Sequence, residues 1–219
     1  MFIGHFAVGF GSKRIAPDTP LTWLLVAPSF LDVLWPIFVL TGVERAAIDP
    51  GNTAFTPLDL AYMPWSHSLV MAVLWSILFA LVYFAWRRDR RGALVLAAGV
   101  FSHWVLDWIT HRPDMAIAPG IDTRVGLGLW NSIVGTLVVE STLFAIGVTL
   151  YLRATRAKDG IGRWALVGLV VFLLISYVGA AFGPPPPNIQ TATMAALIAT
   201  VVLTAWAAWI ERHRASTCF

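Results

Sequence analysis

Histidine and aspartate recur at every fourth residue in one apolar stretch of this 219-residue chain. The three residues are His103, Asp107 and His111. On a helix this spacing places all three side chains on one stripe, with a rise of about 6 Å between His103 and Asp107. An imidazole and a carboxylate one turn apart can share a proton or bind one metal ion. The pattern therefore indicates acid–base or metal chemistry.

Further residues of the same chemical types lie within or beside other apolar segments. Imidazole nitrogens combined with carboxylate oxygens suit Zn²⁺ or another divalent metal. The expected metal ligands are His5, Asp32, His67, His103, Asp107 and His111. Either of two carboxylates, Asp32 or Glu140, is expected to act as a catalytic general base.

Most of these residues also have a structural interpretation. His103 and Asp107 can form a hydrogen-bonded pair that fixes helix packing. Asp32 or His67 can cap the start of a helix by satisfying free N–H groups. Glu140 can make an interhelical hydrogen bond in its protonated form. These alternatives stay open at the level of sequence.

The composition is that of a membrane protein. Hydrophobic residues make up 58% of the chain and charged residues 12%, with a mean hydropathy of +0.74. Soluble domains carry about 25% charged residues. The pI near 9.4 does not point to nucleic acid, because the basic residues are grouped in short loops between apolar runs. The single cysteine, Cys218, excludes an intrachain disulfide.

The apolar runs predict an all-α, polytopic membrane helical bundle formed by one membrane domain over residues 1–219. A span needs about 20 residues, so residues 2–11 are expected to form only a short N-terminal half-helix. Pro28 and Pro36 are expected to break or kink the first span. The six expected transmembrane helices cover about 23–41, 64–86, 92–111, 127–152, 164–182 and 192–210. Residues 1–111 form the expected metal-site half, and 127–210 contain three further spans.

The distribution of basic residues predicts the orientation. All but three of the 15 Lys and Arg residues lie in the N-terminal turn or in the loops after the second, fourth and sixth spans. The exceptions are Arg45, Arg112 and Arg124. The positive-inside rule therefore places both termini in the cytoplasm. The pattern does not define an oligomeric state.

Three acids lie inside the expected spans without any Lys or Arg in the same segments. They are Asp32, Asp107 and Glu140. An aspartate near the middle of a bilayer costs roughly 2.5–3.5 kcal/mol on insertion scales. These acids must therefore be protonated, face water or bind cations. Their depths are compatible with one cavity in the outer half of the membrane, which His5 joins only if the half-helix folds into the bundle.

The order of short motifs resembles a bacterial inner-membrane family. The motifs are Gly4-His5, Pro28 with Asp32, Ser66-His67-Ser68 and Ser102-His103-x-x-x-Asp107. They resemble those of the LexA-binding, inner-membrane-associated proteins classed as membrane-bound metal-dependent hydrolases. A similar order of ligands occurs in zinc-dependent phospholipase C. The resemblance covers residues 1 to about 111, and it implies a metal site and hydrolase activity.

Three functions follow from these patterns. The first is a membrane-embedded metal-dependent hydrolase that binds Zn²⁺ and acts on an amphiphilic, lipid-like ester or phosphoester in the bilayer. The second is a cation or proton transporter that uses the intramembrane acids and histidines. The third is a non-catalytic membrane scaffold in which the polar residues hold helices together.

Overall fold

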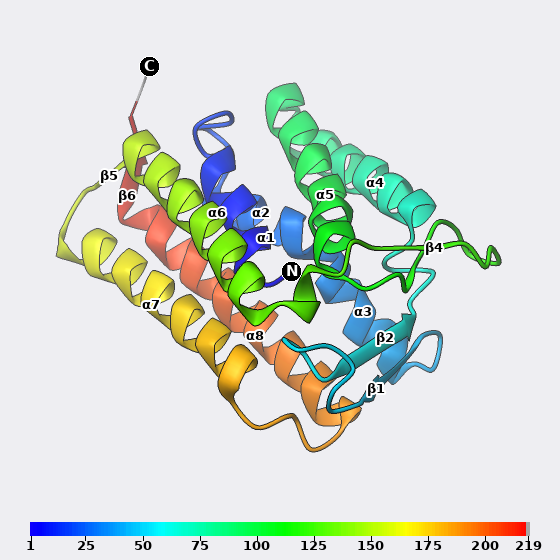
Figure 1. The fold of residues 1–219 in the computed structure, drawn as a ribbon. Helices are drawn as coiled ribbons and strands as arrows, with labels where there is room; N and C mark the ends of the chain where they lie inside the picture. Colours follow the sequence, from blue (N-terminus) through cyan, green and yellow to red (C-terminus); the bar gives the residue numbers. More distant parts are fainter. Residues whose placement is uncertain (218–219) are drawn as a thin grey trace.

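The protein is a helical membrane bundle with three small two-stranded sheets, as its computed structural model shows for residues 1–217 (Figure 1). Six helical segments in this part of the chain are long and apolar enough to cross a membrane. In chain order the elements are α1 (Ile3–Ser12), α2 (Leu21–Val26), η1 (Ala27–Ser29), α3 (Phe30–Leu40), β1 (Arg45–Ile48), β2 (Leu58–Tyr62), α4 (Leu69–Arg87), α5 (Arg90–Thr110), β3 (Met115–Ala116), β4 (Arg124–Val125), η2 (Leu129–Asn131), α6 (Ile133–Ala154), β5 (Thr155–Ala157), α7 (Gly160–Phe182), α8 (Ile189–Arg212) and β6 (Arg214–Ser216). The all-α, six-span architecture is therefore confirmed, including the short helix at the N-terminus.

Side-chain caps decide where five of the spanning helices begin. In each case a polar side chain accepts the backbone N–H three residues later, which satisfies a donor that the helix leaves free. The capping residues are Ser68, Asp89, Ser132, Asp159 and Asn188. As a result α4 begins at Leu69, later than the expected start near residue 64.

The first span is discontinuous, as its prolines predict. A 3₁₀ turn, η1, joins α2 to α3 and contains Pro28. Helix α5 packs directly against this turn at Gly99, where an added Cβ would lie 3.3 Å from Ala27 Cβ and 3.4 Å from Pro28 Cδ. The close approach brings the broken span against the helix that carries His103 and Asp107.

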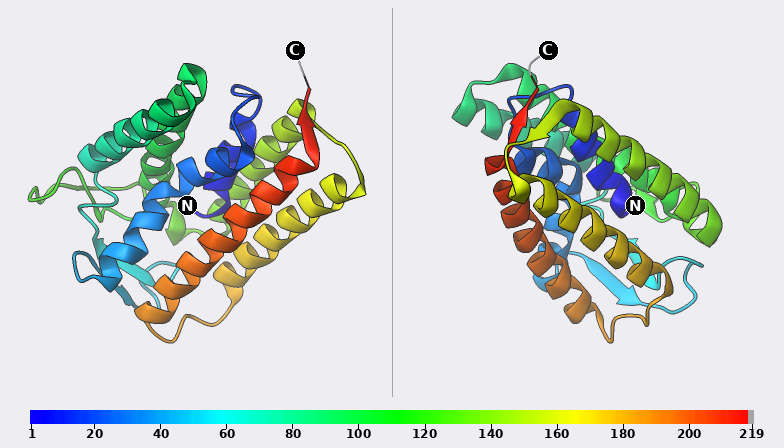
Figure 2. Two further views of the ribbon diagram at one scale, coloured as in Figure 1. Left: turned by 180° about the vertical axis from the view of Figure 1, so that it is seen from behind. Right: turned by 90° about the vertical axis from the view of Figure 1, so that its left-hand side faces the viewer.

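Helix α1 lies inside the bundle, where it packs between α5 and α6 (Figures 1 and 2). Phe6 and Phe10 on α1 belong to an apolar core shared with α6, α7 and α8. A second core joins α4 and α5 to the broken first span. The half-helix thus folds into the bundle, as the expected site requires.

The basic loops gather at one end of the bundle, where the C-terminal segment also lies (Figure 2). There Lys13 Nζ lies 2.7 Å from Glu211 Oε1 at the end of α8. The Thr19 hydroxyl lies 3.4 Å from Asp89 Oδ2 in the turn between α4 and α5. These contacts link loops that are distant in sequence, so they place the basic segments on one side.

The β1–β2 and β3–β4 hairpins lie at the opposite end (Figure 1). The Val70 N–H of α4 donates to Ile117 O beside the second hairpin, at 3.0 Å. The Phe55 N–H of the first hairpin donates to Trp130 O in η2, also at 3.0 Å. The hairpins thereby cover the end of the bundle toward which His103, Asp107 and His111 are directed.

Candidate metal centre

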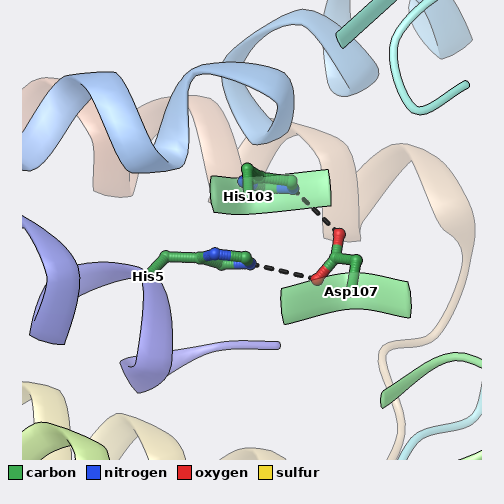
Figure 3. A group of neighbouring side chains, drawn as sticks. All are labelled: His5, His103 and Asp107. Atoms are coloured by element: carbon green, nitrogen blue, oxygen red, sulfur yellow. Dashed lines mark hydrogen bonds and ion pairs between the residues drawn. The ribbon is translucent and has the colours of Figure 1, made fainter. Parts of the chain in front are cut away.

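The structure brings all six expected ligands together at the C-terminal half of α5. Asp107 is central to the group, because each of the four nearby histidines places its Nε2 within 3.9 Å of this carboxylate. The distances are 3.1 Å for His5, 2.9 Å for His103, 3.7 Å for His67 and 3.9 Å for His111. Figure 3 shows His5 and His103 directed at the two different oxygens of Asp107.

Two overlapping sets of side chains are close enough to hold one ion each. The first set is His5, His103 and Asp107, and the second is Asp32, His67 and His103. Within each set the ligand atoms lie within 4.8 Å of one another. The sets share His103, so together they could hold one or two ions. We refer to His5, Asp32, His67, His103, Asp107 and His111 as the cluster.

His103 is oriented by a backbone carbonyl. Its Nδ1–H donates to Pro28 O at 2.8 Å, in the break of the first span. In the neutral ring this bond leaves Nε2 without a proton and directed at Asp107 Oδ2. Metal-binding histidines commonly make such a bond through the nitrogen that does not bind the metal.

His67 is oriented by a chain of hydrogen bonds that sequence reasoning did not identify. The Ser66 hydroxyl donates to Glu44 Oε2 at 2.6 Å, so its oxygen accepts from His67 Nδ1–H at 2.7 Å. Glu44 also accepts the backbone N–H groups of Ser66 and Trp65, both at 2.8 Å. This chain fixes the ring, and in the neutral ring it leaves His67 Nε2 without a proton.

The Nε2 atoms of His67 and His103 face each other, and in the neutral rings both carry a lone pair. His67 Nε2 lies 3.1 Å from His103 Nε2, and both lie near Asp107 Oδ2. Lone pairs of two imidazoles and a carboxylate repel one another at such distances unless a cation lies between them. A bound metal ion or an extra proton on one ring removes the repulsion. The geometry therefore fits the donor set of a divalent metal site.

His111 joins the cluster from outside the helix. Helix α5 ends at Thr110, and His111 has extended backbone geometry, so the expected continuous helical stripe ends at Asp107. The ring nevertheless points back toward Asp107, because its Nδ1 bonds to Asp114 Oδ1 at 3.0 Å and the ring packs at a tilt against Trp130, with centroids 4.4 Å apart. His111 is buried rather than solvated.

Asp32 and Glu140 occupy different positions. The Asp32 side chain is 49% exposed, and its Oδ1 lies 3.6 Å from His67 Nε2. Glu140 is fully buried and accepts the backbone N–H groups of Phe2 and Gly4 at 2.8 and 3.2 Å. Glu140 belongs to neither candidate metal set, so the two carboxylates that the sequence proposed as bases have distinct surroundings.

One further polar group contacts Asp107. The amino nitrogen of Met1 lies against Oδ1. This group belongs to the backbone, so the types and spacing of side chains give no signal for the contact.

A cavity of about 350 Å³ adjoins the cluster. At its polar end it is lined by Asp32, His67, Asp107 and His111. Most of its remaining wall is apolar and comes from α1, α3, the first hairpin, η2, α7 and α8, including Phe2, Phe6, Trp35, Phe55, Leu60, Met63, Trp130, Ala180 and Leu203. The volume lies at the lower end of the range of about 300–1,000 Å³ for small-molecule sites.

Comparison with known proteins identifies a family. A family model described as YdjM inner membrane protein matches residues 64–183, more than half of the chain. No curated protein and no solved structure matches. The matched region includes His67, His103, Asp107, His111 and Glu140, and it continues through α6 and α7. The expectation that the resemblance ends near residue 111 is therefore wrong, whereas the inner-membrane family itself is confirmed. The chain belongs to the YdjM inner membrane protein family and is a multi-pass protein of the inner membrane.

Proposed function

We propose that this protein is a membrane-embedded metal-dependent hydrolase. The observation that carries the proposal is the convergence of His67 Nε2, His103 Nε2 and Asp107 Oδ2 within 3.7 Å of one another, while the Nδ1 atom of each ring is hydrogen-bonded elsewhere. Membrane interiors penalise polar groups that have no partner. A divalent cation, with Zn²⁺ favoured by these donors, satisfies all three groups at once.

His5, His67, His103 and Asp107 would hold the ion, with His111 and Asp32 at the edge of the site. When bound, a divalent ion polarises an ester or phosphoryl oxygen and lowers the pKa of a water ligand from about 15.7 toward about 7. Asp32 is the better placed general base, because its carboxylate is exposed to the cavity while that of Glu140 is buried. A base must reach the proton that it removes.

The apolar cavity supports an amphiphilic ester or phosphoester as the substrate class. Its wall from Phe2, Phe6 and Trp35 can accommodate hydrocarbon, and its polar end places an ester group beside Asp32 and His67. A lipid-like molecule in the bilayer has both parts. Chromogenic acyl esters and phosphodiesters with short, medium and long chains test this class in detergent.

Metal analysis tests the proposal directly. We expect protein purified with zinc in the medium to contain about one or two equivalents of divalent metal, in keeping with the two candidate sets. His103→Ala should lose this metal and the hydrolytic activity. His213→Ala, a surface histidine at the basic end, is the matched control and should retain both. Metal-free wild-type protein, or full metal content in His103→Ala, contradicts the proposal.

Transport is the second candidate, and the broken first span favours it. Transporters place an acid beside a discontinuous helix near mid-membrane, and Asp32 follows such a break and faces a cavity. Proteoliposomes distinguish the two functions. Metal uptake or proton flux without hydrolysis of any test ester supports transport. If alanine at His103 or Asp107 changes only stability, the cluster is a scaffold.

We also propose that both termini are cytoplasmic. The contacts between basic loops place these loops at one end of the bundle, which is the end that the positive-inside rule assigns to the cytoplasm. Single cysteines introduced at Arg88 and Ile121 in a Cys218→Ser chain test this orientation. In intact cells an impermeant thiol reagent should label position 121 and not position 88. The reverse pattern contradicts the assignment.

A further inference from the structure

We propose that Glu140 is a positioning residue, which together with Gly147 holds α1 so that His5 reaches the cluster. The inference rests on the proposed metal site. It concerns two residues that support the site without binding the metal. Both residues belong to α6, a helix with no side chain in either candidate metal set. The role differs from the general-base role that the sequence proposed for Glu140.

Glu140 satisfies the free donors at the start of α1. No residue of α1 or its N-cap position supplies a side-chain cap. Glu140 Oε2, from a different helix, instead accepts the N–H groups of Phe2 at 2.8 Å and Gly4 at 3.2 Å. The first N–H groups of a helix have no partner within it and attract a carboxylate. Because Gly4 precedes His5 directly, this contact anchors the backbone next to the imidazole.

Gly147 permits the second contact, two turns further along α6. A Cβ at this position would lie 2.2 Å from Ala7 O and 2.7 Å from Ala7 Cα. The two helices can therefore approach this closely only when residue 147 is glycine. Since Ala7 follows His5 by two residues, α6 contacts α1 on both sides of the proposed ligand.

His5 depends on this anchoring more than the other histidines do. His67 and His103 are each oriented by a hydrogen bond at Nδ1. His5 Nδ1, in contrast, is buried without a hydrogen-bond partner among the described residues. Its ring stacks parallel on His103, with centroids 3.8 Å apart, and its Nε2 faces Asp107 (Figure 3). The position of the ring is therefore set largely by where α6 places the backbone of α1.

A double-mutant cycle tests the coupling between Glu140 and His5. Zinc affinity is measured by chelator competition for Glu140→Ala, His5→Ala and the double variant. Glu140→Ala should weaken binding by about 10–100-fold and His5→Ala by at least as much, and the double variant should bind no more weakly than His5→Ala alone. Glu140→Gln keeps an acceptor oxygen and should retain most of the affinity. Ser141→Ala, at the exposed neighbouring position, is the control. Additive losses, or wild-type affinity in Glu140→Ala, overturn the inference.

A measurement that does not need metal separates this inference from the proposed function. His5→Cys in a Cys218→Ser chain places a thiol at a position that is 1% exposed. A small membrane-permeant thiol reagent should label it slowly, and adding Glu140→Ala should make labelling several-fold faster. Faster labelling supports the positioning role even if the protein with His5 intact proves to bind no metal, a result that would reject the hydrolase alone. Unchanged labelling rejects the positioning role, whatever the metal content.

Discussion

Asp107→Asn should abolish metal binding and hydrolysis while the protein stays folded. Asparagine has the shape of aspartate but lacks the charge, and the Asp107 carboxylate lies within 3.9 Å of four imidazole nitrogens. Loss of a residue that only orients a ligand costs about 10–100-fold in affinity, so loss of this central ligand should exceed about 100-fold. Zinc titration and ester hydrolysis in detergent measure the effect.

The matched control is Asp122→Asn in the exposed turn between β3 and β4. It removes the same charge outside the cluster and should leave metal content and activity unchanged. Thermal unfolding in detergent checks that Asp107→Asn remains folded. A folded Asp107→Asn protein that keeps wild-type zinc affinity would show that Asp107 is not a ligand.

Ser66→Ala should lower zinc affinity by about 10–100-fold through His67. The change removes the hydroxyl that accepts from His67 Nδ1 at 2.7 Å and donates to Glu44 at 2.6 Å. Without this hydroxyl the His67 ring is no longer held in one orientation. The tautomer with an unprotonated Nε2 is also no longer favoured. Chelator competition gives the affinity, and the rate of ester hydrolysis should fall in parallel.

The serine on the other side of His67 provides the control. Ser68 accepts the Met71 N–H and caps α4, and its hydroxyl has no part in orienting the ring. Ser68→Ala should cost about 1 kcal/mol of stability and leave zinc affinity unchanged. If the two alanine variants lose equal affinity, the hydrogen-bond chain to Glu44 does not act on the metal.

Hydropathy and residue spacing predicted the parts of this protein that follow from local physics. The six spans follow from long apolar runs, and the break at Pro28 follows from a residue that lacks an N–H. The meeting of Asp32, His67 and His103 was predicted from the cost of polar groups in the bilayer and from their similar depths. These features depend on short segments of the chain, so they can be predicted from a single sequence.

Long-range contacts could not be predicted in the same way. Glu44 reaches Ser66 because the pairing of β1 with β2 brings the two ends of the hairpin together, and no periodicity marks that pairing. Glu140 lies at the depth of the proposed metal-binding residues. Because α1 packs between α5 and α6, however, the Glu140 carboxylate accepts backbone N–H groups at the start of α1 instead. The sequence signal for this role was an acid inside an apolar helix, which needs N–H donors such as those at the start of another helix. Only the tertiary arrangement identifies which helix provides them.

The location of α1 separates the order of synthesis from the order of assembly. His5 precedes the six candidate spans of the described chain, yet the surfaces that receive its helix belong to α5 and α6. Helices of a membrane protein associate after they have entered the bilayer. The contacts between α1 and α6 therefore form only after α6 has entered the bilayer. His5 can then take its place beside Asp107 only once the helix that anchors α1 is in the membrane.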